Sequence, residues 1–166
     1  RRGLASAYLL AVAVAKRLQP TLVLSVAGSL AKPREAVREL ADWTAAQADL
    51  VYEMNVRTAY TQGMLTRMQD PDVKRVLPGL RFVSACLPTT RPNHRAAHEL
   101  VAPTESALWD QFSPPIGHGC RCALREVSYS EARQKGWLDA EGNLRTITPP
   151  GFAKAGPDPG FVVYRR

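Results

Sequence analysis

The sequence predicts an α+β fold in which N-terminal helices lead into a small mixed module, and the module ends in an extended C-terminal tail. Three observations carry this prediction. Residues 4–69 contain long stretches with helical spacing, residues 80–127 contain short alternating segments separated by prolines, and residues 137–166 are rich in Pro and Gly. Because 45% of the 166 residues are hydrophobic and 22% are charged, the chain can bury a core and is not disordered overall.

Residues 1–49 are expected to form a helical, basic N-terminal arm. Residues 4–18 are rich in Ala and Leu and contain no Gly or Pro, which favours a helix that stops or kinks at Pro20. Residues 21–27 fit a short strand or a buried helical turn equally well. A further helical stretch runs through residues 33–69, because apolar residues recur there mostly at three- and four-residue intervals. Those residues are Ala36, Val37, Leu40, Trp43, Ala46, Leu50, Val51 and Met54.

The positive charge is concentrated at the start of the chain. The net charge is +7, and residues 1–30 hold four basic residues and no acidic one: Arg1, Arg2, Lys16 and Arg17. Such a segment suggests an anionic neighbour, either an acidic protein surface or double-stranded DNA contacted without sequence preference. The apolar run in residues 4–15 is too short for a bilayer, which needs about 20 apolar residues, so we expect a packing segment and no membrane contact.

Residues 50–136 are expected to form the compact module. Two segments are predicted to be strands: residues 80–86, which alternate as a strand does, and residues 121–127. Three short helical segments complete the prediction: residues 94–100 with Asn93 as N-cap, residues 105–111 anchored by Leu108 and Trp109, and a helix bracketed by Ser130 and Gly136.

Residues 137–166 are expected to form a docking tail. They hold four of the 13 prolines and four of the 11 glycines, and they show no regular hydrophobic period. Phe152, Phe161 and Tyr164 are the residues that this tail could bury against a neighbour. We expect the apolar surfaces of residues 1–31 and residues 137–166 to be covered by partner chains.

Two pairs of metal-competent side chains lie between the predicted strands. His94 and His98 share one face if their segment is helical, and Cys120 and Cys122 share one face if theirs is a strand. Two nitrogens and two sulfurs form a tetrahedral zinc set, which we expect to be structural. The alternative is a metal-free site with histidines bonded to backbone carbonyls and thiols packed as small hydrophobes.

Other residues near these pairs complete the cysteine and histidine inventory. Cys86 and His118 are reserve ligands for the same site. The chain's three cysteines are too few for a disulfide scaffold, which favours reduced thiols and intracellular synthesis.

The order of motifs in residues 50–160 resembles the phage Mu F-protein-like family of phage head morphogenesis proteins, also called minor head proteins. The resemblance is carried by NVRTAYTQGMLTRMQ, LRFVSAC, TRPNHRAAHE, ALWDQFSPPIGHGCRCAL and the tail. The residues that match the family motifs are Arg91, Pro92, His94, Trp109, Pro114, Pro115, Cys120, Arg121 and Cys122. Leu87 stands near the place of a usual Asp, and Glu99 replaces a usual Gly. Residues 1–49 are expected to lie outside the resemblance.

The resemblance implies a structural virion component near the portal vertex, made in the host cytoplasm. The implied partners of this component are the portal protein, the major capsid protein or scaffold, and packaged DNA. The resemblance also implies that the protein is not an enzyme. The family usually has an Asp shortly before Arg91, and this chain lacks it, which argues against a hydrolytic role for the site.

Two other functions stay open on the sequence alone. A zinc-dependent hydrolase or nuclease would use the same His/Cys set, although Arg95 stands where the metalloprotease H-E-x-x-H pattern needs Glu. The module could also deliver an effector domain within a larger virion protein. The chain has no initiator Met, so we expect it to be part of a longer polypeptide.

Overall fold

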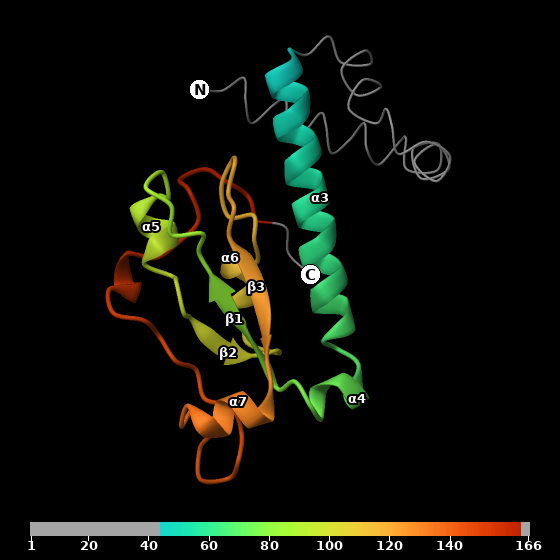
Figure 1. Ribbon diagram of the computed structural model, residues 1–166, viewed down its shortest axis with the longest axis vertical. Coiled ribbons are helices and arrows are strands. Elements are labelled where there is room, and N and C mark those ends of the chain that lie inside the picture. The colour runs from blue at the N-terminus through green and yellow to red at the C-terminus, as the bar shows by residue number, and fades with distance from the viewer. Residues whose placement is uncertain (1–43, 164–166) are drawn as a thin grey trace. The chain divides into compact units, whose positions relative to one another are not determined.

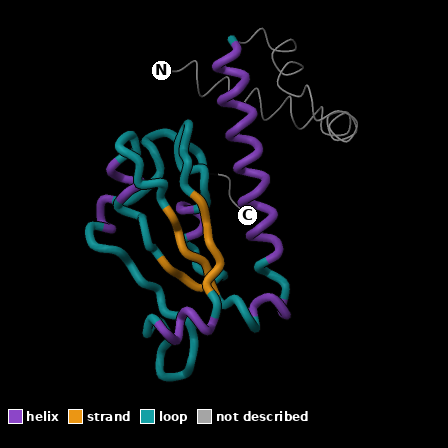
Figure 2. The backbone as a smooth tube through the Cα atoms, viewed as in Figure 1, coloured by secondary structure: helices purple, strands orange, loops and turns teal. Residues whose placement is uncertain are grey.

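The computed structural model describes residues 44–163, which are the coloured parts of Figures 1 and 2. The chain divides into two compact units, Arg1–Asp49 and Leu50–Arg166, and the second contains the module described below. The predictions for residues 1–43 and for Tyr164 lie outside the described residues. No helix within the described part is long and apolar enough to cross a membrane.

The long helix of the prediction is present as α3 (Ala45–Arg67). Its first turn is closed by a capping box: the Gln47 N–H donates to Thr44 Oγ1 at 3.3 Å, and the Thr44 N–H donates to Gln47 Oε1 at 3.0 Å. The short helix α4 (Pro71–Lys74) follows, with Asp70 as its N-cap. The predicted Asp70-Pro71 turn is therefore the start of a helix.

A three-stranded antiparallel sheet forms the centre of the module. Strand β1 (Gly79–Val83) lies between β2 (Val101–Pro103) and β3 (Ala123–Val127). Both β1 and β3 were predicted as strands, whereas the short β2, which contains a proline, was not. Gly79 has no room for a side chain, since a Cβ there would lie 2.2 Å from Leu144 Cδ2 and 2.5 Å from the Ala102 carbonyl oxygen.

The main core packs large apolar side chains against this sheet. Leu80, Phe82, Trp109 and Ile116 are each 0% exposed, and Met68 brings the end of α3 into the same cluster. The Trp109 indole N–H donates to the Pro103 carbonyl at 2.8 Å, so its burial leaves no polar group unpaired. Each such side chain contributes roughly 1.5–3 kcal/mol by burial. The predicted anchor role of Trp109 is confirmed.

Short helices surround the sheet, with bounds that differ from the predictions. They are α5 (Pro92–Arg95), α6 (Trp109–Phe112) and α7 (Tyr129–Gln134). Ser128, not Ser130, caps α7 by accepting from the Glu131 N–H at 3.1 Å. Figure 1 shows α5 and α7 at opposite ends of the sheet.

The predicted helix over residues 94–100 ends early, and Asn93 is not its N-cap. Arg91 takes the N-cap position, followed by Pro92 in the first turn. The Glu99 N–H donates to the Phe82 carbonyl, and the Phe82 N–H donates to the Leu100 carbonyl. This pairing with β1 draws the chain out of the helix and leads it into β2.

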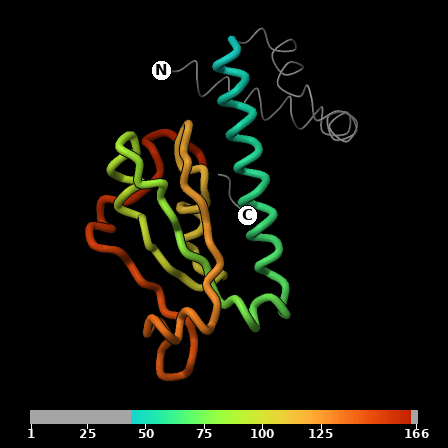
Figure 3. Tube along the Cα trace, viewed as in Figure 1, coloured from blue at the N-terminus to red at the C-terminus, as the bar shows by residue number. Residues whose placement is uncertain are grey.

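The C-terminal segment is extended, as predicted, but it returns along its own module, as Figure 3 shows. Ile147 forms an antiparallel bridge with Val101, and Phe152 and Phe161 pack against the main core, which includes the 8% exposed Val163. The expectation that a partner chain covers Phe152 and Phe161 therefore needs correction. The reason is physical: a small module gains core area by folding this segment onto itself.

Candidate metal site

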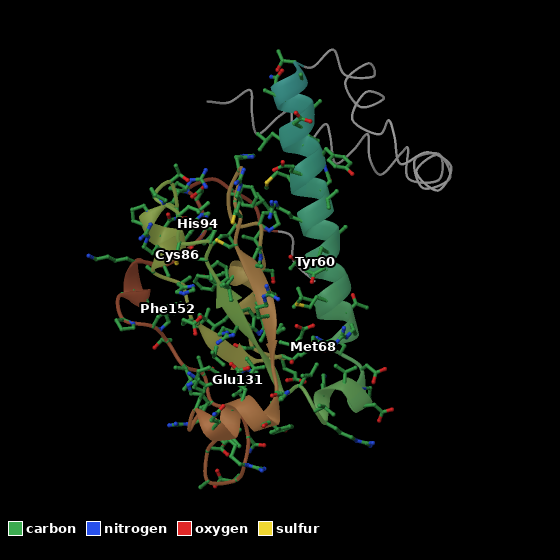
Figure 4. All side chains as sticks on the ribbon, in the orientation of Figure 1. Tyr60, Met68, Cys86, His94, Glu131 and Phe152 are labelled. Carbon is green, nitrogen blue, oxygen red and sulfur yellow. The ribbon has the colours of Figure 1, made fainter. Side chains whose placement is uncertain are left out.

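Three of the predicted ligands meet at the α5 end of the module. The ligand atoms of His94, Cys120 and Cys122 all lie within 4.8 Å of one another, and all three residues are buried. His94 is on α5, while both cysteines lie in the loop just before β3, so the predicted strand starts after Cys122. Figure 4 shows His94 at the end of the module opposite Glu131 of α7.

The two nitrogens of His94 have different partners. Nδ1 lies 3.8 Å from Cys122 Sγ, and Nε2 lies 3.0 Å from Asp158 Oδ1. Since a carboxylate accepts hydrogen bonds, the proton belongs on Nε2 and the lone pair of Nδ1 faces the thiols. This orientation suits a histidine ligand that binds metal through Nδ1.

The pKa values of the two cysteines shift in opposite directions. A hydrogen bond with Cys122 lowers the pKa of Cys120 to about 4; His94 acts in the same direction, and burial opposes both. The same hydrogen bond raises the pKa of Cys122, with burial and the charge of Cys120 adding to it. These opposite shifts favour Cys120 as the thiolate, which is the form that ligates metal, and metal binding would have to deprotonate Cys122 as well.

Asp158 is the site residue that sequence reasoning missed. It holds His94 from the C-terminal segment, 64 residues downstream. Arg91 Nε lies 3.1 Å from its Oδ2, and Asn93 Nδ2 donates to its Oδ1 at 3.3 Å. One sequence signal could have found it: Asp158 is the only acidic residue after Glu141.

Gly117 makes room for this contact. A Cβ at Gly117 would lie 2.1 Å from Asp158 Oδ2 and 3.1 Å from His94 Cε1. Real Cβ atoms are not found that close to a neighbour, so a side chain at this position would displace the carboxylate. Gly117 is therefore needed because it leaves space for the carboxylate of Asp158.

His98 and the two reserve ligands stand outside this cluster. His98 Nδ1 accepts from the Ser84 N–H at 3.1 Å, and its side chain is 37% exposed. Because the chain leaves α5 after Arg95, the expected shared helical face with His94 does not form. Cys86 is exposed, and the His118 ring packs edge-on to Phe161 with centroids 5.1 Å apart.

A cavity of about 450 Å³ adjoins the cluster. Its lining includes His94 and both cysteines together with Thr89, Thr90, Arg91, His118 and Arg121. The lining contains no carboxylate among the residues that the structure describes. Two thiolates and one imidazole beside a cavity can hold a tetrahedral zinc ion whose fourth position is open.

Comparison with known proteins identifies relatives of this chain. Residues 13–125 match the family model described as "Phage Mu protein F like protein". The match begins at residue 13, so the expectation that residues 1–49 lie outside the family is wrong for residues 13–49. The chain is also 30% identical over 86 residues to the "Putative capsid assembly protein F" of Escherichia phage Mu. That match covers 52% of this chain and 19% of the Mu protein. No solved structure gives a significant match.

Proposed function

This chain belongs to the phage Mu protein F like family, and on that premise we propose that it is a structural protein of phage head assembly. The family match over residues 13–125 carries the proposal. The Mu relative is named as a putative capsid assembly protein, which supports the same role. The protein acts by binding other head components and does not catalyse a reaction.

The proposed place of action is the virion, at the portal vertex or the capsid interior. The partners are the portal protein and the major capsid protein or its scaffold. The basic residues Arg1, Arg2, Lys16 and Arg17 give the N-terminal arm an affinity for packaged DNA that does not depend on sequence. The docking function of residues 137–166 is proposed only for the surface that the core leaves exposed, where Val162 is 70% exposed.

We further propose that the site holds a structural Zn²⁺ through His94, Cys120 and Cys122. Thiolate and imidazole ligands favour zinc over hard cations such as Mg²⁺ or Ca²⁺. The ion would tie α5 to the start of β3 across a region that has little regular structure. His98, the fourth ligand expected from sequence, is not part of the cluster, and its Nδ1 accepts a hydrogen bond from the Ser84 N–H.

Three measurements test these proposals. Deletion of the gene in the phage that encodes it should leave heads defective by electron microscopy, and complementation should restore them. Co-expression with the portal and major capsid proteins of the same phage should recover the protein in assembled particles. Normal infectious particles that lack the protein would end the assembly role. For the metal, elemental analysis should give one equivalent of zinc in wild type and none in Cys122→Ser.

A zinc-dependent hydrolase or nuclease is the second candidate, because three protein ligands beside a cavity also describe catalytic zinc. The described part of the lining holds no carboxylate, so the general base that such sites usually place beside the metal would have to be His118. The family match favours the structural role. Zinc-loaded wild type should therefore cleave neither plasmid DNA nor a model ester above the rate of Cys122→Ser. Cleavage by wild type but not by Cys122→Ser would favour the hydrolase or nuclease over the structural role.

A further inference from the structure

We infer that Asp158 positions His94 for metal binding, and that this contact couples the metal to docking of the C-terminal segment. The inference rests on the zinc site proposed above and adds a residue and a consequence to it. Asp158 lies beyond residues 13–125, the part of the chain that matches the family model.

The first support is the direction of the His94 ring. Asp158 Oδ1 accepts from Nε2–H at 3.0 Å on one side, while Nδ1 faces Cys122 Sγ on the other. A ligating histidine almost always donates its other ring N–H to such an acceptor, which fixes the tautomer and makes the ligand nitrogen more basic. Without Asp158 the ring could rotate or carry its proton on Nδ1, where it blocks the metal.

The second support is that Asp158 is itself held in place. Its side chain is 18% exposed and pairs with Arg91, while its backbone N–H donates to the Ile116 carbonyl at 2.9 Å. Asn93 donates to Asp158 Oδ1 and also to the Gly156 carbonyl, at 2.9 Å. The carboxylate therefore sits where α5, the loop before the cysteines and the C-terminal segment meet, in space that Gly117 leaves open.

These contacts make the coupling reciprocal. If docking of the C-terminal segment raises metal affinity by orienting His94, then metal binding must stabilise the docked segment by the same factor. Loss of outer partners of ligating histidines typically weakens metal binding about 10–100-fold. We expect the same range here, and an equal change in the opening equilibrium of the segment around Asp158.

The first arm of the experiment measures metal binding in the full chain. Zinc affinity, by competition with a chromogenic chelator, should fall about 10–100-fold in Asp158→Ala. Asp158→Asn should recover part of this loss, because its amide oxygen can still accept from Nε2–H. The cobalt-loaded protein should show an altered visible spectrum in Asp158→Ala, which a merely destabilised chain with intact coordination would not. Asp110→Asn, an exposed carboxylate on α6, is the matched control and should behave as wild type.

The second arm measures the segment itself. Hydrogen exchange in peptides covering residues 149–163 should be about 10–100-fold slower with zinc than without it in wild type, and this difference should vanish in Asp158→Ala. Gly117→Ala should mimic Asp158→Ala while leaving every polar group in place. It also serves as the second variant if Asp158→Ala fails to fold.

The outcomes separate the inference from the proposal beneath it. A wild type that binds no zinc removes the metal site and the inference with it. Zinc bound equally tightly by wild type, Asp158→Ala and Gly117→Ala, with exchange of residues 149–163 indifferent to metal, overturns the inference alone. Weaker zinc binding without any change in the exchange of the segment overturns the coupling.

Discussion

Replacing each histidine in turn distinguishes the three-ligand site from the four-ligand set expected from sequence. His98→Ala removes the acceptor of the Ser84 N–H, which lies at 3.1 Å from Nδ1, from a side chain that is 37% exposed. The lost hydrogen bond should lower the free energy of unfolding by about 0.5–1.5 kcal/mol, because water can partly replace the imidazole. The zinc content of His98→Ala should stay at one equivalent.

His94→Ala should behave differently on both measurements. It removes a buried ligand and leaves Asp158 without one of its partners, so zinc should be lost and the melting temperature should fall even in chelator. The assay is elemental analysis together with thermal unfolding, each with and without chelator. If His98→Ala loses zinc as completely as His94→Ala, the three-ligand hypothesis is refuted and His98 is a fourth ligand of the ion.

Three further perturbations test the fold and the arm. Gly79→Ala should cost about 1–3 kcal/mol in denaturant unfolding, since its Cβ would collide with the Ala102 carbonyl; an unchanged midpoint would show that β2 shifts freely. Ser128→Ala should cost about 0.5–2 kcal/mol by removing the α7 cap, whereas Ser130→Ala should be nearly neutral, and equal effects would restore Ser130 as the cap. DNA binding by the full chain should fall steeply with salt, with a log–log slope of about −0.9 per phosphate neutralised. Substitution of the four basic residues in 1–30 should flatten that slope, and a strong preference for one duplex sequence would contradict the prediction.

Local pattern was enough to predict the parts of the fold that depend on nearby residues. Strand β1 follows from alternation, β3 lies within the predicted strand over residues 121–127, and the end of α7 follows from Gly136, which has a φ of 67°. The pairing of His94 with the two cysteines was also predictable, because each side of the pair lies within a short, recognisable motif. The structure brings those three residues together as the sequence suggested.

The parts that sequence reasoning missed depend on contacts between distant segments. His98 was predicted to share a helical face with His94 because the two residues have i, i+4 spacing. The backbone hydrogen bonds of Phe82 with Glu99 and Leu100 instead end the helix before His98. Glu99 adopts a φ of 68°, a conformation in which glycine is unstrained, which explains the glycine that the resemblance places there. Asp158 could not be assigned, because nothing in its neighbourhood shows that it folds back onto α5.

The span between His94 and Asp158 also sets the order in which the protein can be completed during its synthesis. The two residues are 64 positions apart, which corresponds to about 3–13 s at a translation rate of ~5–20 residues per second. His94 is made first, the two cysteines follow 26 and 28 residues later, and the carboxylate that orients the histidine is made last. Contacts of such long sequence separation slow folding. The nascent chain therefore holds all three proposed metal ligands before the residue that orients one of them has been made.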